Sequence, residues 1–544
     1  MNKMSRSRQS LLAKSLLVFL LAFATLLFLR PLIAGKAKNE AQKSRQTPAP
    51  TPQTKTPSDT SELAKRINSV IDESGFAAAR WGISAVSMSS GTTLYQRDAD
   101  KLFTPASNMK IYTTGVALDL LGADYRWRTS VYAKAQPGSS GTIQGDLILY
   151  GRGAPDLVTR SQDANKGSLA KLADDLYGRG IRRVEGNVIG DESYFRGDSV
   201  GDGWQWTDMQ WYFGAEASAL SVNENQIDVN LVPSSKTGEP PVVRTSDAES
   251  YVTVENRMIT RERGERTTIG LHRGLSDNNI QVWGEFAPGS KGFGARLSVH
   301  NPALWAAKML LDALKTRGIV ITGQAQARDS RQPRSQRFDP SQAVELAAVT
   351  SQPLSEIARK TNKDSNNLYA ELILRTLGRE RGEMLGQPEQ IGRERGDDET
   401  GLAVLRLWLT RAGISTERIA LHDGCGLSRL DLVTPETTVQ LLLSLSKTAS
   451  SQIFRQSLPI AGRDGTLGGR LKSISDRVSA KTGSLTYINS LSGYLTTADG
   501  EQIAFSILCN DQVSRGNATL LIDEITALLA SFPHLPTKSQ EKGK

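Results

Sequence analysis

A serine and a lysine stand three positions apart, as Ser107 and Lys110, in the segment FTPASNMK. A serine hydroxyl becomes a strong nucleophile only beside a base, and a neutral lysine amine can be that base. Thr104 is expected to cap a helix and Pro105 to take its first position, with residues 111–121 continuing it. Ser107 would then lie in the first turn, where free N–H groups and the helix dipole favour an anion. Lys110 would share its face, so the segment predicts a lysine-activated serine nucleophile.

The S-x-x-K spacing is weak evidence by itself, because the chain contains it four times. The other pairs are Ser168/Lys171, Ser444/Lys447 and Ser539/Lys542. They fall in an amphipathic helix, an apolar stretch and the polar tail, where a surface or packing role is expected. Two further motifs distinguish Ser107 from these serines.

The second motif is S-x-N, formed by Ser365 and Asn367 at the start of an expected helix that runs to Leu377. The serine hydroxyl could relay a proton, and the asparagine amide could hold a peptide carbonyl and a lysine side chain. The alternative copy, SDN at 276–278, is flanked by residues that indicate only a loop.

The third motif is K-T-G, formed by Lys481, Thr482 and Gly483 and followed by Ser484. The sequence after it is typical of a strand, a turn and a second strand. The glycine removes the side chain that would block a ligand lying against the strand. The alternative KTG at 236–238 precedes Glu-Pro-Pro, and proline cannot donate to a central strand ladder.

The order S-x-x-K, S-x-N, K-T-G is the signature of the penicillin-recognising serine acyl-transferases. Ser107 and Ser365 are 258 residues apart, and Ser365 and Lys481 are 116 apart, so a large insertion must separate the first two motifs. Over residues 62–533 the chain closely resembles the low-molecular-mass class C penicillin-binding proteins, the dacB-type D-Ala-D-Ala carboxypeptidase/endopeptidase family. Further segments that carry the resemblance are GRGAPDL (151–157), WQW (204–206), SAL (218–220), NNLYAE (366–371), DGCGLSR (423–429), DGTL (464–467) and LSGY (491–494).

The resemblance implies an α/β (α+β) fold with a β-lactamase/transpeptidase-like catalytic domain. This domain would be built from residues 62–126 and 346–536, around a β-rich insertion at 127–345 with a nested subdomain near 150–221. The sequence pattern agrees in outline. It predicts strands at 81–87, 129–132, 147–150 and 184–189, and helices at 63–72, 304–314 and 519–529.

The resemblance also implies the catalytic roles. Ser107 would attack the carbonyl between two D-alanines while Lys110 takes its proton, and Ser365 would help protonate the departing D-Ala. The backbone N–H groups of Ser107 and Ser484 would form the oxyanion hole. Lys481 would keep Lys110 neutral, because a like charge nearby disfavours protonation.

Substrate binding is implied for four side chains. Asn367 would contact the peptide, and Lys481 with the hydroxyls of Thr482 and Ser484 would hold the terminal carboxylate. The partners would be peptidoglycan peptides ending in D-Ala-D-Ala, with β-lactams as covalent inhibitors. No metal or organic cofactor is required. The family usually has serine at Cys425, so this chain is expected to place a thiol near the cleft.

The first 35 residues indicate export. Lys3, Arg6, Arg8 and Lys14 precede an apolar run from Leu16 to Leu29, the pattern of a secretory signal. Residues 16–34 could instead remain as a membrane tether, and cleavage and anchoring both stay open. The Pro/Thr-rich segment 36–61 is expected to be a linker, and 537–544 a polar tail. The protein would work in the periplasm or on the outer face of the cytoplasmic membrane.

The net charge argues against a nucleic-acid-binding protein, and the spacing of histidines and cysteines argues against a zinc site. The segments outside residues 61–536 carry ten more cations than acids, so the net charge of +9 leaves −1 for the body, which argues against nucleic-acid binding. The four histidines are scattered without zinc-ligand spacing, and the two cysteines, Cys425 and Cys509, are not expected to pair.

Two alternatives remain beside the carboxypeptidase. A β-lactamase shares the acylation chemistry, but the large insertion and the lack of a recognisable deacylating glutamate argue against it. A catalytically silent wall scaffold would keep only the fold. The intact motif residues Ser107, Lys110, Ser365, Asn367 and Lys481 argue against that alternative.

Overall fold

The computed structural model describes residues 57–158, 167–246, 251–262, 266–287, 290–333, 337–386, 396–514 and 516–533. The expected export segment 1–35, the tail 537–544 and the expected linker up to residue 56 lie outside these ranges. Within them, no helix combines the length and the apolar character needed to cross a membrane.

Helix α2 (Pro57–Asp72) begins inside the segment that the sequence analysis assigned to the linker. The folded chain therefore starts about one turn earlier than expected. Proline is favoured in a first helical turn, which agrees with a helix that begins at Pro57. Leu63 and Ile67, four positions apart, are both fully buried and hold the helix to the body.

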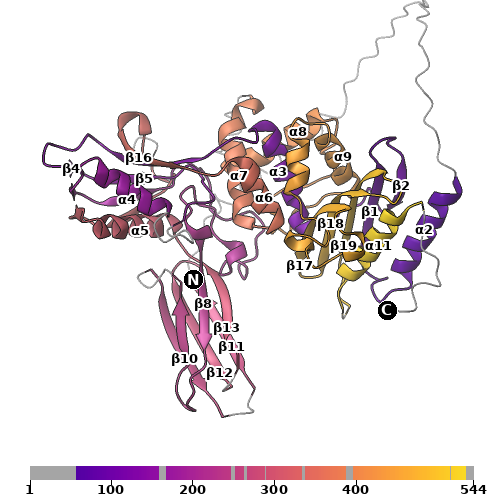
Figure 1. Ribbon diagram of the computed structural model, residues 1–544, viewed down its shortest axis with the longest axis horizontal. Helices are drawn as coiled ribbons and strands as arrows, with labels where there is room; N and C mark the ends of the chain where they lie inside the picture. Colours follow the sequence, from indigo (N-terminus) through magenta and orange to yellow (C-terminus); the bar gives the residue numbers. More distant parts are fainter. Residues whose placement is uncertain are drawn as a thin grey trace, which may run out of the picture. The chain divides into compact units, whose positions relative to one another are not determined.

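A five-stranded antiparallel sheet joins the two ends of the chain (Figure 1). Its order is β17-β18-β19-β1-β2, so β17, which carries the K-T-G motif, lies at an edge. The strands are β1 (Arg80–Ser87), β2 (Thr93–Arg97), β17 (Val478–Leu485), β18 (Ile488–Thr496) and β19 (Gln502–Asn510).

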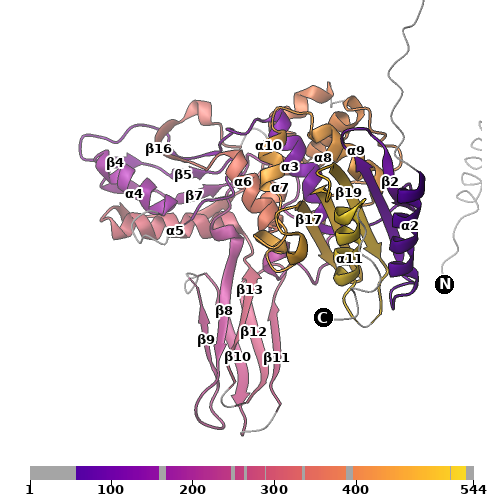
Figure 2. The same cartoon turned by 45° about the vertical axis from the view of Figure 1, so that its right-hand side comes forward.

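Both faces of this sheet are buried, and successive residues of β19 point to opposite faces. Phe505 and Ile507 pack on one face with α2 and α11 (Thr519–Ser531), and Figures 1 and 2 draw these two helices on the same side of the sheet. Ala504 and Leu508 pack on the other face, in one hydrophobic cluster with a second group of helices. These are α3 (Met109–Leu120), α6 (Leu354–Lys363), α7 (Asn367–Arg381), α8 (Asp397–Arg411), α9 (Pro435–Leu445) and α10 (Ser451–Ser457).

Between α3 and α6 the chain builds a second layered region. A five-stranded sheet has the order β15-β7-β5-β3-β16, and a three-stranded sheet has the order β14-β6-β4. Their strands are β3 (Arg128–Ala133), β4 (Thr142–Gln144), β5 (Leu147–Tyr150), β6 (Arg183–Glu185), β7 (Val188–Asp191), β14 (Val320–Ile321), β15 (Ala325–Arg328) and β16 (Val344–Thr350). Helices α4 (Ser168–Gly178) and α5 (Pro302–Thr316) share one core with them.

Two further three-stranded sheets lie within residues 226–298, grouped below α5 in Figure 2. They have the orders β13-β8-β9 and β10-β12-β11. Their strands are β8 (Gln226–Val232), β9 (Val242–Thr245), β10 (Thr253–Thr260), β11 (Thr268–Arg273), β12 (Asn279–Phe286) and β13 (Phe293–Ser298).

The insertion is organised differently from the expectation. Residues 150–221 do not form a nested piece, because β6 and β7 pair with strands on both sides of them in sequence. The segment with its own sheets is 226–298. The expected boundary at 345 also falls inside β16, which pairs with β3 from Val344 to Thr350. The expected single strand at 184–189 is two strands, because β6 and β7 belong to different sheets.

Candidate active site

Ser107 lies in a 3-10 turn, η1 (Ala106–Asn108), directly before α3. The expected helix cap is wrong: Thr104 caps nothing, and its backbone N–H and C=O instead bond to the side chain of Asn510 in β19. Asn108 donates to the hydroxyl of Ser492 in β18 over 2.7 Å. Bonds to the sheet, in place of a helix cap, therefore hold the start of this helix and the serine on it.

Lys110 reaches the nucleophile and is completely buried. Its Nζ lies 2.9 Å from Ser107 Oγ, 2.6 Å from Asn367 Oδ1 and 2.8 Å from the backbone oxygen of Cys425. Burial lowers the pKa of Lys110 from its ordinary value, although the nearby carboxylates of Asp423 and Glu371 oppose that change. A neutral amine at this position can accept the proton of Ser107.

Ser365 occupies a backbone conformation that normally favours glycine. It follows the end of α6 with a φ of +58°, and the N–H of Asn366 bonds back to the carbonyl of Thr361 over 3.0 Å. This is the bond pattern of a Schellman turn, whose left-handed residue is usually glycine. The turn aims the hydroxyl of Ser365 at Lys481 Nζ, 2.9 Å away.

Lys481 is also fully buried, and its Nζ donates to the carbonyl of Thr482 as well as to Ser365. Burial, and next the positive charge of Lys110, hold the pKa of Lys481 well below its ordinary value. Burial is the main cause of the low pKa of Lys110, and repulsion between the two buried amines is mutual, so it disfavours protonating both at once. The expected effect of Lys481 on Lys110 stays a prediction.

Gly483 allows β17 to approach the nucleophile. A Cβ atom at this position would lie 3.0 Å from the backbone nitrogen of Ser107 and 2.8 Å from the carbonyl oxygen of Pro105. Real Cβ atoms rarely come this close to backbone atoms, so a larger residue would push the strand away. The neighbouring Ser484 is therefore carried beside Ser107.

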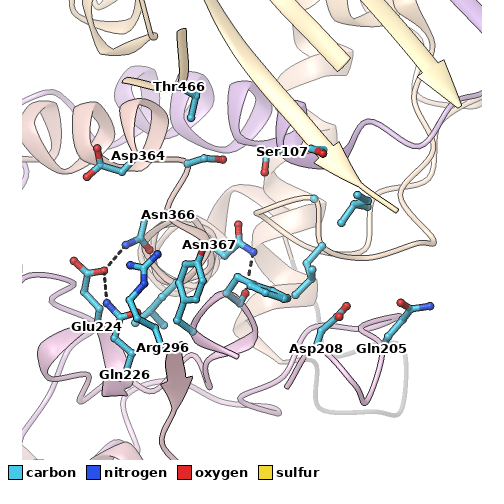
Figure 3. Close-up of a pocket in the computed structure, with 18 of the residues that line it drawn as sticks. Ser107, Gln205, Asp208, Glu224, Gln226, Arg296, Asp364, Asn366, Asn367 and Thr466 are labelled. Carbon is cyan, nitrogen blue, oxygen red and sulfur yellow. Dashed lines mark hydrogen bonds between the residues drawn. The ribbon is translucent and has the colours of Figure 1, made fainter. Parts of the chain in front are cut away.

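A cavity of about 690 Å³ collects these groups. Ser107, Ser365, Asn367 and Ser484 line it, and Figure 3 shows Ser107 and Asn367 facing the same space. Lys110 and Lys481 are buried behind the lining and reach it through their bonds to the two serines. Thr482 is half-buried and does not line the cavity, but its hydroxyl bonds to that of Thr466, which does, over 2.7 Å.

The alternative copies of the motifs lie elsewhere. Ser168 begins α4, Ser444 is in α9, and Ser539 falls outside the described residues. Lys236 is 76% exposed and pairs with Glu239. None of the described copies lines the cavity.

Sequence reasoning missed several groups that complete the site. Thr466 lines the cavity, the carbonyl of Phe213 accepts from Asn367 over 2.9 Å, and the carbonyl of Cys425 accepts from Lys110. The segments that carry Thr466 and Cys425 were recognised as motifs, but nothing in them indicated these contacts. A backbone carbonyl leaves no signature in side-chain identity.

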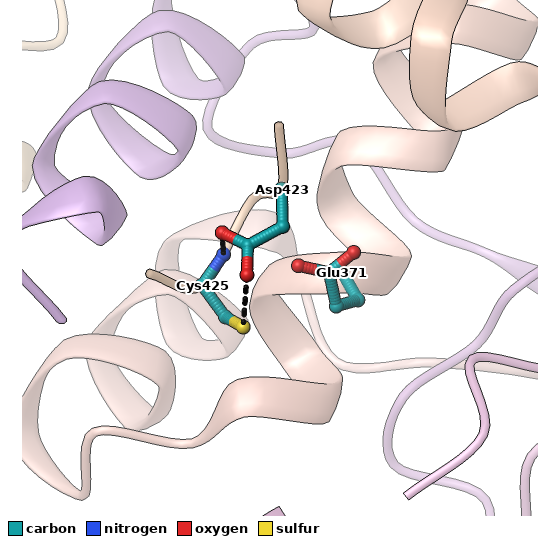
Figure 4. A group of neighbouring side chains, drawn as sticks. All are labelled: Glu371, Asp423 and Cys425. Atoms are coloured by element: carbon teal, nitrogen blue, oxygen red, sulfur yellow. Dashed lines mark hydrogen bonds between the residues drawn. The ribbon is translucent and has the colours of Figure 1, made fainter. Parts of the chain in front are cut away.

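Cys425 lies near the cleft, since the next residues, Gly426 and Leu427, line the cavity, but its thiol is not part of the lining. It is buried, with Sγ 3.4 Å from Asp423 Oδ2, and burial raises the pKa of the thiol well above its ordinary value. Figure 4 shows it grouped with Asp423 and Glu371, their ligand atoms all within 4.8 Å of one another. Hydrogen bonds already engage both carboxylates. Arg375 and the N–H of Gly424 donate to Glu371, while Asp423 accepts several backbone N–H groups. The bonds of Asp423 thus hold the backbone around Cys425, whose carbonyl accepts from Lys110.

A family model and the curated relatives of this chain all point to D-Ala-D-Ala carboxypeptidases. The model of the D-Ala-D-Ala carboxypeptidase 3 (S13) family matches residues 63–531. A D-alanyl-D-alanine carboxypeptidase from an Actinomadura species is 32% identical over 485 residues, which cover 87% of this chain and 85% of the relative. The D-alanyl-D-alanine carboxypeptidase DacB of Haemophilus influenzae is 28% identical over 405 residues, covering 74% and 79%.

A solved structure shows the same fold. The crystal structure of penicillin binding protein 4 (dacB) from Haemophilus influenzae covers 86% of this chain and 99% of its own, at 24% identity and a TM-score of 0.72. Its complex with a novel β-lactam has a TM-score of 0.65. This likeness confirms the expected penicillin-binding α/β fold with a β-rich insertion. With its three motifs gathered in one cavity, the chain belongs to the D-Ala-D-Ala carboxypeptidase 3 (S13) family.

Proposed function

We propose that the chain is a penicillin-sensitive serine D-Ala-D-Ala carboxypeptidase that acts on peptidoglycan stem peptides through an acyl-enzyme on Ser107. The observation that carries this proposal is the contact of Ser107 Oγ with Lys110 Nζ at 2.9 Å. Ser107 lines a cavity that Ser365 also lines. The family assignment and the names of its relatives support the activity.

Acylation begins with attack of Ser107 Oγ on the carbonyl carbon of the penultimate D-Ala. Lys110 takes the hydroxyl proton, for which its lowered pKa makes it available as a neutral amine. When the C–N bond breaks, the proton held by Lys110 passes to the departing amine through Ser365, which Lys481 touches at 2.9 Å. Terminal D-Ala leaves and Lys110 is neutral again. It then takes a proton from the water that attacks the ester carbonyl, and that proton goes to Ser107 Oγ as the ester C–O bond breaks and the shortened peptide is released as an acid.

The backbone N–H groups of Ser107 and Ser484 would stabilise the oxyanion. Support comes from the close approach of β17 at Gly483 and from the position of Ser484 on the cavity wall. Each such donor contributes about 2.7–4 kcal/mol in comparable sites. Lys481 and the hydroxyls of Thr482 and Ser484 would hold the terminal carboxylate, with Thr466 fixing the Thr482 hydroxyl.

Endopeptidase activity on cross-links would use the same steps, with a larger amine as the leaving group. The cavity volume of about 690 Å³ supports this second activity, because ligand pockets of 300–1,000 Å³ hold molecules much larger than alanine. Digestion of purified peptidoglycan with mass analysis of the products would separate loss of terminal D-Ala from cleavage of cross-links.

Export by the N-terminal segment would put the enzyme where its substrate is, in the periplasm or on the outer face of the cytoplasmic membrane. Support comes only from the basic and apolar pattern of residues 1–35. A reporter fused after residue 60 should be active outside the cytoplasm. Activity confined to the cytoplasm would overturn this part, and membrane fractionation of the fusion would distinguish an anchor from a cleaved signal.

The catalytic assignment is tested with Ser107→Ala. Covalent labelling by fluorescent penicillin should disappear while circular dichroism stays unchanged. The matched controls Ser168→Ala and Ser444→Ala should label like the wild type. Labelling that persists in Ser107→Ala would contradict the assignment. Faster turnover of a cephalosporin than of a D-Ala-D-Ala peptide would favour the β-lactamase alternative.

A further inference from the structure

The turn that carries the S-x-N motif is held from outside by the inserted region. Its middle residue, Asn366, begins α7, where its Oδ1 accepts from the N–H of Tyr369 over 3.0 Å. The amide nitrogen of the same side chain points away from the helix and donates to Glu224 Oε2 over 2.8 Å (Figure 3). Asn366 therefore links the motif to a carboxylate from a segment about 140 positions earlier in the chain.

Glu224 makes contacts on both sides of this turn. Its Oε1 lies 3.1 Å from the Nζ of Lys360, one helical turn before the end of α6, and Gln226 donates to Oε2 over 3.3 Å. One carboxylate thus bridges the helix that ends at the turn and the helix that starts from it. Its side chain is 24% exposed and lines the active-site cavity.

The backbone that presents this carboxylate is strained. Asn223, Glu224 and Asn225 have successive φ angles of +49°, +56° and +52°. L-residues enter this left-handed region as single residues, and non-glycine residues do so at an energetic cost. A run of three persists because the buried side chain of Asn225 bonds to the N–H of Val222 and to the carbonyl of Glu216.

The strained backbone sets the direction in which the Glu224 side chain points. A regular turn between Val222 and β8 would not need three left-handed residues. Here the turn ends with the Glu224 carboxylate against Lys360 and Asn366, beside the two catalytic groups Ser365 and Asn367. Strained backbone at such a place indicates a functional constraint.

We propose that Glu224 is a positioning residue for acylation. It holds the amide of Asn366 and the end of α6 so that Ser365 stays aimed at Lys481 and Asn367 at Lys110. The inserted region thereby completes the active site without touching the reacting atoms. The proposal rests on the proposed function, because its measure is the acylation step.

The test uses full-length enzyme and resolves penicillin labelling into noncovalent binding and the acylation rate constant. Glu224→Ala should lower the rate constant about tenfold or more, since misplacing a catalytic group by 1 Å can cost 10²-fold. Noncovalent binding should change less than about twofold. Glu239→Gln is the matched control, because Glu239 forms an exposed ion pair with Lys236 in the same inserted region. It should acylate at the wild-type rate.

A reciprocal exchange distinguishes positioning from general stability. Asn366→Asp keeps an acceptor for the N–H of Tyr369 but sets a second carboxylate against Glu224, so acylation should slow. In Glu224→Gln/Asn366→Asp the bond can re-form with donor and acceptor reversed. The rate constant should then recover to within about threefold of the wild type, which a merely destabilised fold would not do.

Three results would overturn the proposal: an acylation rate in Glu224→Ala within twofold of the wild type, an equal loss in Glu239→Gln, or no recovery in the folded double variant. Absence of labelling in the wild type would instead refute the proposed function. The two failures are therefore distinguishable.

Discussion

Lys481 donates from its Nζ to the Oγ of Ser365 over 2.9 Å, so the K-T-G lysine contacts the S-x-N serine directly. The motifs by themselves imply separate roles for these residues, in carboxylate binding and in proton transfer. Their contact means that a change at Lys481 affects both substrate binding and the chemical step.

Replacing Lys481 should therefore be costly, whereas replacing its surface counterpart should not. The terminal carboxylate of a bound substrate would favour the charged form of Lys481. Loss of that charge-assisted hydrogen bond costs about 2–3 kcal/mol, so Lys481→Ala should lower kcat/KM about 30- to 150-fold on a D-Ala-D-Ala peptide. Lys236→Ala, at an exposed ion pair, should change it less than about twofold. Steady-state kinetics provide the measurement. A substrate amidated at its C-terminus should reduce the difference between wild type and Lys481→Ala, because the carboxylate is absent from both.

The acylation rate should fall on the acid side through the titration of Lys110. Burial lowers the pKa of this amine, so it is neutral above that pKa and accepts the proton of Ser107. As the pH falls through it, the amine becomes charged and the rate is lost. The rate of penicillin acylation, measured over the whole pH range in which the enzyme stays folded, should show this limb below the ordinary pKa of lysine. Lys110→Arg, which keeps the charge, should show almost no acylation anywhere in that range. A flat wild-type profile would exclude Lys110 as the base.

A methyl group at Gly483 should separate the edge strand from the nucleophile. The added Cβ would lie 3.0 Å from the nitrogen of Ser107, so β17 must move away and carry Ser484 with it. Gly483→Ala should slow acylation about 100-fold. Gly469→Ala is the control, because a Cβ there meets no atom within 4 Å. Equal rates for the two variants in penicillin labelling would show that the close approach has no catalytic importance.

The buried ion pair between Arg375 and Glu371 should make a large contribution to the free energy of unfolding. Arg375 is 1% exposed and lies 2.6 Å from the fully buried carboxylate of Glu371. Arg375→Met would leave that charge unpaired beside Asp423, which should lower the free energy of unfolding by about 3–5 kcal/mol. Urea unfolding followed by fluorescence provides the measurement. Lys171→Ala, which breaks the exposed pair with Asp175, should leave the midpoint unchanged. A similarly small effect of Arg375→Met would contradict this account.

Local patterns in the sequence predicted much of the framework. The strand Trp81–Ser87 was found as β1, and the helix expected at 519–529 as α11, because alternation and helical periodicity of apolar residues reflect burial within a single element. The export segment stays a prediction, since it lies outside the described residues. The linker end at 61 was wrong by about one turn, because helix starts depend on a few polar residues whose preferences are weak.

The sequence by itself determined which residues carry the chemistry. Ser107 and Lys110 share one turn of chain, and the order of three motifs separates them from their copies elsewhere. The first relationship is local and the second is an order along the chain, so residue types and their spacing are enough to recognise both.

Only the tertiary structure decided how the groups meet. The contact of Ser365 with Lys481 and the bond of Glu224 to Asn366 join residues more than 100 positions apart. The burial that lowers the pKa of Lys110 comes from helices and strands of both ends of the chain. Such contacts depend on how separate elements pack, and packing leaves no mark in the spacing of residues along one segment.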